Sequence, residues 1–169
     1  MEARQYSPFV TIEDAKRRYP VDMEGLARQL GLEVFELSMP KEMSGRLLKT
    51  QTGYRIHVNA AHGRNRKRFT MAHEIAHFML HRDLFDQQIV DDEMYQSEQI
   101  TSRLESQANA YAAELLMPEL RLTARYLELK DAHRPTEIVE QMASEFQVSR
   151  HAMRIRLESV VDFQDPLNP

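Results

Sequence analysis

The chain has 169 residues, of which 42% are hydrophobic and 28% are charged, a composition that is typical of globular proteins. Its formal net charge is −4, so no global positive field attracts it to nucleic acid or to anionic lipid. It has no cysteine, which excludes disulfides, thiol nucleophiles and thiolate zinc sites. The chain begins without an apolar signal segment and has no apolar run of membrane-spanning length, so we expect a cytoplasmic protein without membrane contact.

The first third of the chain predicts two short helices followed by a small sheet. Helical patterns cover residues 11–19 and 22–30, and in the second of these Asp22 can cap the start and Gly31 can end the helix. Alternating and β-branched residues then indicate strands, and a short turn joins the last two into a hairpin. We therefore expect an antiparallel sheet of about three strands, at residues 32–37, 45–50 and 54–59.

The rest of the chain is predicted to be mainly helical. Residues 64–82 form a helix that is apolar on nearly every side from Phe69 to Leu80, which indicates burial. An acidic connection without lysine follows, and it is either a solvated loop or an acidic rim beside a substrate cleft. Further helices are expected at residues 97–117 and 119–130, and a helix-turn-helix-like pair at residues 136–160.

Three histidines recur at intervals of four in the segment TMAHEIAHFMLH, residues 70–81. Residues four apart lie on one face of a helix, so His73 and His77 can offer two imidazoles to one zinc ion. His81 lies about 12 Å from His73 along the helix axis, whereas two ligand atoms of one zinc ion are only about 3.4 Å apart. We therefore exclude His81 as a ligand. His81 would instead contact a ligand without reaching the metal, or lie at the helix end, where the helix dipole favours a cation.

Glu74 follows His73 directly and is rotated from it by about 100° around the helix axis. Its carboxylate would lie beside the metal, where it can take a proton from a water molecule and return it to a leaving amine. The residues HEIAH thus have the His-Glu-x-x-His pattern of zinc peptidases, with Glu74 as the catalytic residue. The alternative is a core helix with buried structural histidines.

A catalytic zinc ion takes three protein ligands, so the third must come from another element. Glu105 lies beside the core stripe of the next predicted helix and has no obvious partner, and we expect it to point toward the interior. A salt-bridged or half-exposed position is the alternative for this glutamate, and Asn109 carries an amide, which is a weaker ligand than a carboxylate. The remaining candidates are Glu98, Glu114, His57, His62 and the carboxylates of the acidic connection.

Two segments, RFTMAHEIAHFMLH and ESQANAYAAELLMP, together resemble the ImmA/IrrE family of zinc metallopeptidases. The resemblance begins near residue 20 and extends through the hairpin and the histidine helix into the alanine-rich helix. Members of this family are zincin-like, and the glutamate of their E-x-x-A-N pattern is the third zinc ligand. The resemblance therefore implies an α+β fold and a Zn²⁺ ion held by His73, His77 and Glu105, with Asn109 as a residue that supports a ligand.

The resemblance also implies a function and a substrate. The chain would be a zinc-dependent endopeptidase that cleaves a helix-turn-helix repressor of the Xre type and so relieves repression. A substrate segment could lie extended beside an edge strand of the sheet. The alternative is a regulator without proteolytic activity, which binds DNA or a repressor and has a structural or vestigial zinc site.

Candidates for stabilising the oxyanion are His57, His62, Tyr95 and His133.

We expect a zincin-like metallopeptidase domain at residues 1–130 and a helical appendage at residues 131–169. Residues 134–158 contain four arginines and four glutamates, so this part of the appendage has no net charge. A protein that binds duplex DNA needs a positive surface, and none is evident here. We therefore expect the helix pair, with Ser149 capping its second helix, to pack on the first domain or a partner protein rather than bind DNA directly.

Overall fold

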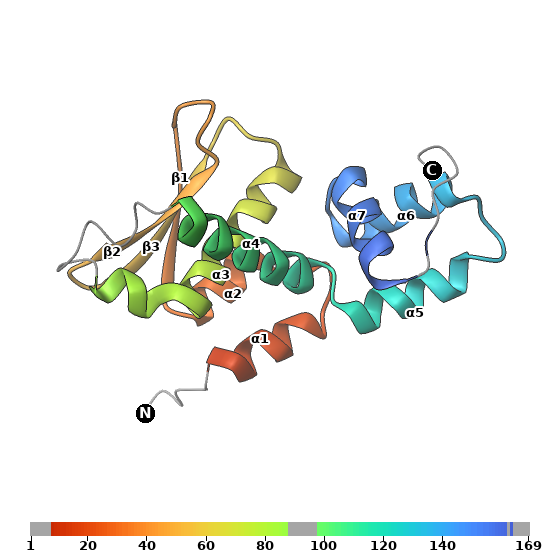
Figure 1. Cartoon of the computed structure of the whole chain (residues 1–169), viewed down its shortest axis with the longest axis horizontal. Coiled ribbons are helices and arrows are strands. Elements are labelled where there is room, and N and C mark those ends of the chain that lie inside the picture. The colour runs from red at the N-terminus through yellow and green to blue at the C-terminus, as the bar shows by residue number, and fades with distance from the viewer. Residues whose placement is uncertain (1–7, 88–97, 162, 164–169) are drawn as a thin grey trace.

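The computed structural model describes residues 8–87, 98–161 and 163. Over these residues it is an α+β protein with a single three-stranded sheet, as expected from the sequence (Figure 1). None of the described helices is long and apolar enough to cross a membrane. The helices are α1 (Pro8–Lys16), α2 (Met23–Gln29), α3 (Arg64–Gln87), α4 (Glu98–Leu116), α5 (Glu119–Leu129), α6 (Pro135–Phe146) and α7 (Arg150–Val160). The strands are β1 (Leu32–Leu37), β2 (Gly45–Thr50) and β3 (Gly53–Asn59).

The sheet has the strand order β1-β3-β2, so β3 is its central strand. Strands β2 and β3 form the expected antiparallel hairpin, but β1 pairs with β3 in parallel. The expectation of an entirely antiparallel sheet was therefore wrong, and the sheet is mixed. The reason is topological: β1 and β2 run in opposite directions at the two edges, and a strand inserted between them must be parallel to one of them.

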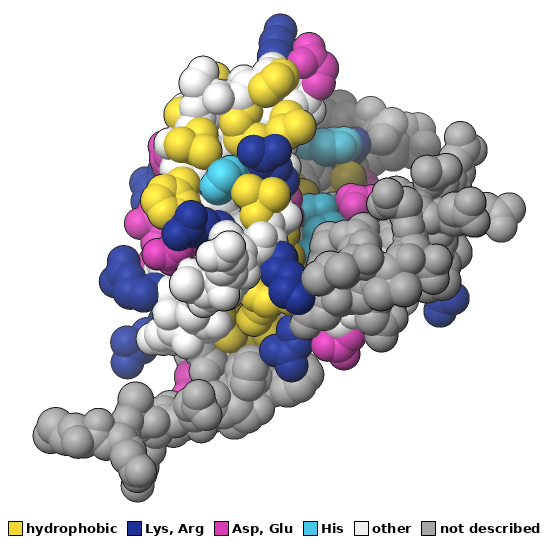
Figure 2. Space-filling view, turned by 90° about the vertical axis from the view of Figure 1, so that its left-hand side faces the viewer, with side chains coloured by type: hydrophobic (Ala, Val, Ile, Leu, Met, Phe, Trp, Pro, Cys, Tyr) yellow, Lys and Arg dark blue, Asp and Glu magenta, His cyan; other side chains and the backbone are white. Residues whose placement is uncertain are grey.

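The two faces of the sheet differ in their burial. On the face that packs on α2 and α3, Val34, Ile56 and Leu47 lie in register, and Ile56 is fully buried. On the opposite face Phe35 and Leu37 are each 40% exposed. The end of the molecule that carries the sheet presents hydrophobic side chains among lysine and arginine side chains (Figure 2). The core therefore lies between the sheet and the helices.

Helix α3 is the central element of this core. It packs against the sheet and also against α4. The buried histidine segment predicted from the sequence is confirmed for most residues, including Ala72, Ile75 and Ala76, which are fully buried. Leu80 is the exception at 44% exposure. The helix continues to Gln87, beyond the predicted end at residue 82.

The last three helices, α5, α6 and α7, pack together. Ser149 caps α7 as expected, since its Oγ accepts a hydrogen bond from the Ala152 amide at 3.1 Å. The turn before this cap lies against the start of α3, where Asn65 donates a hydrogen bond to the carbonyl of Val148 at 2.9 Å. Tyr19 stacks on Phe146, with ring centroids 4.8 Å apart. These contacts join the C-terminal helices to the rest of the protein, while the domain boundary at residue 130 stays a prediction.

Candidate metal centre

Three side chains from α3 and α4 converge at one point. The Nε2 atoms of His73 and His77 are 3.0 Å apart. Glu105 reaches both of them, with Oε2 3.2 Å from His73 Nε2 and Oε1 3.2 Å from His77 Nε2. Two ligand atoms of a tetrahedral zinc ion, each about 2.1 Å from the metal, are about 3.4 Å apart. The spacing and the donor set of two imidazoles and one carboxylate therefore fit a zinc ion.

The far nitrogen of each histidine also has a partner. His73 Nδ1 lies 3.0 Å from Oδ1 of Asn109, and His77 Nδ1 lies 3.1 Å from Nδ1 of His81. An amide oxygen can only accept, so His73 carries its proton on Nδ1 and leaves Nε2 free for a metal. Such outer hydrogen bonds orient metal ligands in proteins. Asn109 thus lies where the resemblance placed a residue that supports a ligand.

Glu105 reaches the cluster from a more open position than expected. Its side chain is 48% exposed, so the expectation that it points into the interior was wrong. The carboxylate contacts both histidines while about half of the side chain stays exposed.

The other ligand candidates with described side chains lie elsewhere. Glu114 pairs with Lys16 at 2.7 Å and with Arg156. The His57 ring lies on the outer face of the sheet beside Phe35, with ring centroids 6.0 Å apart, so it points away from α3. His62 is absent from the cluster of potential ligands found in the described part of the chain. The Glu98 side chain, Tyr95 and most of the acidic connection, with its suggested acidic rim, lie outside the described residues.

Glu74 lies beneath strand β2, beside the three potential ligands. Glu74 as a whole residue is only 7% exposed. Burial, and then the negative charge of Glu105, raise the pKa of Glu74 to about 7, against the lowering effect of a hydrogen bond with the Leu47 backbone. A carboxyl group that titrates near neutral pH can both accept and return a proton under physiological conditions. This is the property expected of a general base and acid.

Glycine at position 45 allows β2 to approach α3 closely at this place. A Cβ atom on Gly45 would lie 2.3 Å from Cγ2 of Thr70 and 3.7 Å from Oε1 of Glu74. Any side chain here would push the strand away from the helix. Nothing in the local sequence distinguishes Gly45, because its role depends on how the strand and the helix pack.

His77 is suited to bind a metal in its neutral form. The pKa of His77 is lowered to about 4, mainly by burial and further by the positive charges that His73 and His81 would carry. The negative charge of Glu105 acts in the opposite direction and raises this pKa. The imidazole is therefore neutral at physiological pH. Metal binding needs a neutral imidazole, so no proton has to be displaced from this ligand.

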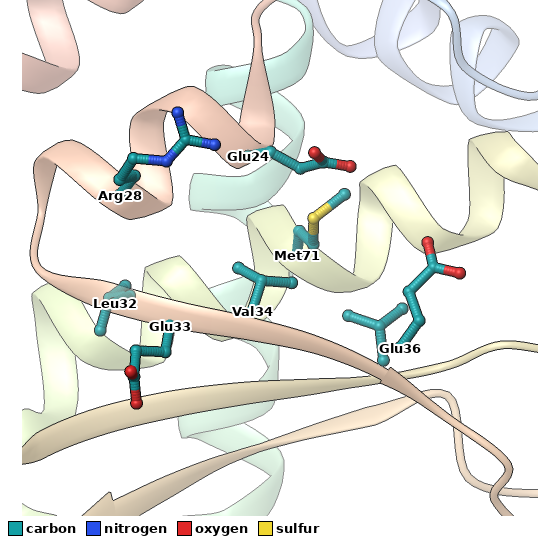
Figure 3. Close-up of a pocket in the computed structure, with 8 residues that line it drawn as sticks. Glu24, Arg28, Leu32, Glu33, Val34, Glu36 and Met71 are labelled. Carbon is teal, nitrogen blue, oxygen red and sulfur yellow. The ribbon is translucent and has the colours of Figure 1, made fainter.

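A separate cavity of about 460 Å³ lies between α2 and β1 (Figure 3). Val34 rises from β1 toward Met71 of α3, and Glu24 and Arg28 project from α2 above it. None of the three potential metal ligands lines this cavity. The chemistry expected from the sequence is therefore concentrated at the α3–α4 cluster and not in this cavity.

Comparisons with known proteins agree with this fold. The structure resembles a solved structure described as a Mycobacterium tuberculosis transcriptional regulator, with a TM-score of 0.60 and 15% sequence identity over 89% of the present chain. The chain spans 46% of that protein, so the likeness concerns the fold alone. No curated protein sequence matches at a significant level. The family model Peptidase_M78, described as the IrrE N-terminal-like domain, matches residues 27–158. The chain therefore belongs to the IrrE N-terminal-like family of metallopeptidase-type domains.

Proposed function

We propose that the protein is a zinc-dependent endopeptidase. The observation that carries this proposal is the convergence of His73, His77 and Glu105 beside the buried carboxyl group of Glu74. Three protein ligands are typical of catalytic zinc sites, whereas structural sites are usually closed by four. Membership of a metallopeptidase-type family supports the same function.

The side chains at the centre divide the chemistry among them. A zinc ion held by His73, His77 and Glu105 would lower the pKa of a bound water molecule to about 7 and polarise a carbonyl group. Glu74 accepts the proton from the attacking water and delivers it to the leaving amine. Asn109 holds the His73 ring in the orientation that points Nε2 at the metal position. Glu105 completes the ligand set from α4.

Strand β2 offers a place for the substrate backbone. It is an edge strand of the sheet, and its Leu47 backbone is hydrogen-bonded to the Glu74 carboxylate. An extended peptide that pairs with the edge of β2 facing away from β3 would pass beside Glu74, with its carbonyl groups near the cluster.

The substrate that we propose is a helix-turn-helix repressor of the Xre type. The resemblance of the two motif segments to those of ImmA/IrrE proteins supports this choice. Cleavage would relieve repression. The neutral charge balance of the C-terminal helices supports contact with protein rather than with DNA, since Arg150 pairs with Glu140 and Arg156 with Glu114.

The alternative function is a regulator that binds a repressor without cutting it and whose zinc site is structural or vestigial. The burial of Glu74 beside the ligands favours the peptidase. A structural site needs no base, and burying a carboxyl group without a function is costly.

Co-expression with a helix-turn-helix repressor separates the two functions. Wild-type protein should produce repressor fragments that mass spectrometry can identify. Glu74→Gln keeps the shape of the side chain and removes the base, so it should leave the repressor intact while still binding zinc. Glu128→Gln, an exposed change on α5 with the same loss of charge, is the matched control and should cleave normally. Equal clearance of the repressor by wild type and Glu74→Gln would favour the regulator that acts by binding.

A further inference from the structure

We propose that His81 and Gln107 form a hydrogen-bonded support that fixes the tautomer and the orientation of His77. His77 Nδ1 lies 3.1 Å from His81 Nδ1, and His81 Nε2 lies 3.1 Å from Oε1 of Gln107. The support therefore runs from the metal-facing imidazole through a second imidazole to an amide on α4. This inference rests on the proposed zinc site and assigns two positioning residues to it.

The direction of each hydrogen bond follows from the first one. His77 Nε2 faces His73 and Glu105 and must carry no proton if it is to bind a metal. Its proton is then on Nδ1, which donates to Nδ1 of His81. His81 in turn holds its proton on Nε2 and donates it to the amide oxygen of Gln107. Every step has one donor and one acceptor, so the arrangement is consistent when both histidines are neutral.

Burial makes this support strong enough to matter. His77 is 8% exposed and His81 is 4% exposed, so water has little access to the hydrogen bond that joins them. A buried imidazole nitrogen without a partner would be costly. His81 is also not a helix-end residue, because α3 continues to Gln87. Of the two positions expected for His81, the helix end is therefore excluded, and the position that contacts a ligand without reaching the metal agrees with its contact to His77.

Gln107 connects this support to the helix that supplies the third ligand. Glu105, Gln107 and Asn109 all belong to α4, and each contacts a different histidine or pair of histidines of α3. Asn109 therefore orients His73 directly, and Gln107 orients His77 through His81, in both cases on the side of the ring away from the metal position. Glu105 contacts both rings on the side of the metal position. A displacement of α4 would change all three contacts together.

Substitutions at His81 can distinguish hydrogen bonding from simple packing. Asparagine places its side-chain oxygen near the position of the histidine Nδ1 atom and can still accept from His77. Glutamine and leucine do not offer an acceptor there. We expect His81→Leu and His81→Gln to weaken zinc affinity by about 10–100-fold, the usual effect of losing an outer partner of a ligand. His81→Asn should restore most of the affinity.

Zinc affinity is measured by competition with a chromophoric chelator, and Co²⁺ binding provides a second readout because its visible spectrum reports coordination geometry. The Co²⁺ spectrum should change for His81→Leu and stay close to wild type for His81→Asn. Gln107→Leu is an exposed change that leaves the core intact, and it should weaken zinc binding in the same direction. Leu80→Asn, next to His81 and 44% exposed, is the control and should bind like wild type.

Two results would overturn the inference and leave the proposed function standing. Wild-type affinity and spectrum in His81→Leu, His81→Gln and Gln107→Leu would show that His77 needs no support. An equal loss in His81→Asn and His81→Leu would assign the effect to packing. Failure of the wild-type protein itself to bind zinc or Co²⁺ would instead overturn the proposed function, and the inference with it.

Discussion

Gly45 and Thr70 bring strand β2 and helix α3 together more closely than any larger residue would allow. A Cβ atom on Gly45 would lie 2.3 Å from Cγ2 of Thr70 and 2.6 Å from the backbone oxygen of His57. Because the obstacle includes backbone, the strand itself would have to move. This close approach keeps the Leu47 backbone within hydrogen-bonding reach of Glu74.

We predict that Gly45→Ala destabilises the protein by about 1–3 kcal/mol, the usual cost of overpacking. Urea denaturation measures the change in the free energy of unfolding. Gly63→Ala is the control for an added methyl group without a clash, because among the described residues no atom outside its chain neighbours lies within 4 Å of the added Cβ. Gly63 precedes α3 and accepts the Lys67 amide, so this change should cost about 1 kcal/mol or less. Thr70→Ser removes the obstructing methyl group and keeps the hydroxyl, so it should restore part of the stability of Gly45→Ala. Equal stability of the two glycine variants would contradict the close packing described above.

Asn109 provides a second test of the site, through His73. Asn109→Leu removes the acceptor for His73 Nδ1 and should weaken zinc affinity by about 10–100-fold. Asn109→Asp keeps an acceptor and adds a negative charge, which strengthens the hydrogen bond, so its affinity should equal or exceed that of wild type. The ranking of the three proteins in a chelator competition is the result to compare. A ranking with Asn109→Leu at or above wild type would exclude this role.

Arg125 and Glu145 should make stability depend on pH. Hydrogen bonds from Arg125, at 2.7 and 2.8 Å, hold the pKa of Glu145 below its ordinary value. A carboxyl group whose pKa is lower in the folded state stabilises the protein above its unfolded pKa and loses this contribution as the pH falls through the folded pKa. Glu145→Gln should therefore cost about 1 kcal/mol at neutral pH and nothing in strong acid. A cost that is the same at both pH values would contradict the ion pair as its origin.

Glu114 should hold the C-terminal helices to the rest of the protein. Its carboxylate contacts Lys16 of α1 at 2.7 Å and Arg156 of α7, and it accepts the Glu119 amide at the start of α5 at 3.2 Å. Glu114→Ala leaves two mostly buried cations without this partner and should cost about 1–3 kcal/mol. Relative to wild type, native-state hydrogen exchange should accelerate more in α7 than in α3. Uniform acceleration of both helices, or none, would contradict this connection.

The sequence predicted the parts of the site that depend on one element and missed those that depend on packing between elements. His73 and His77 could be paired because their spacing alone puts them on one helical face. Glu105 was reached partly through a wrong premise, since position along α4 does not tell how open the space beside it is. The contact of Gln107 with His81 has no signature in the spacing, because it depends on the distance between α3 and α4.

The fold shows the same division. The strands at residues 32–37 and 45–50 were predicted with the correct bounds, because alternation and turn residues are local signals. The parallel pairing of β1 with β3 was missed, because Leu32 and Tyr54 become partners only after the chain has crossed to the opposite edge and returned. The end of α3 was placed too early, since the polar residues after His81 carry no strong helix signal.

Zinc content is the most direct test of the central claim, that His73, His77 and Glu105 form a catalytic zinc site. Elemental analysis of purified protein should find one zinc ion per chain in wild type and in Glu74→Gln. Glu105→Ala should lose most of its zinc, while Glu128→Ala, an exposed glutamate on α5, should retain it. Far-UV circular dichroism confirms that each variant is folded. Full zinc retention by a folded Glu105→Ala protein, or a wild type that binds no zinc, would contradict the claim.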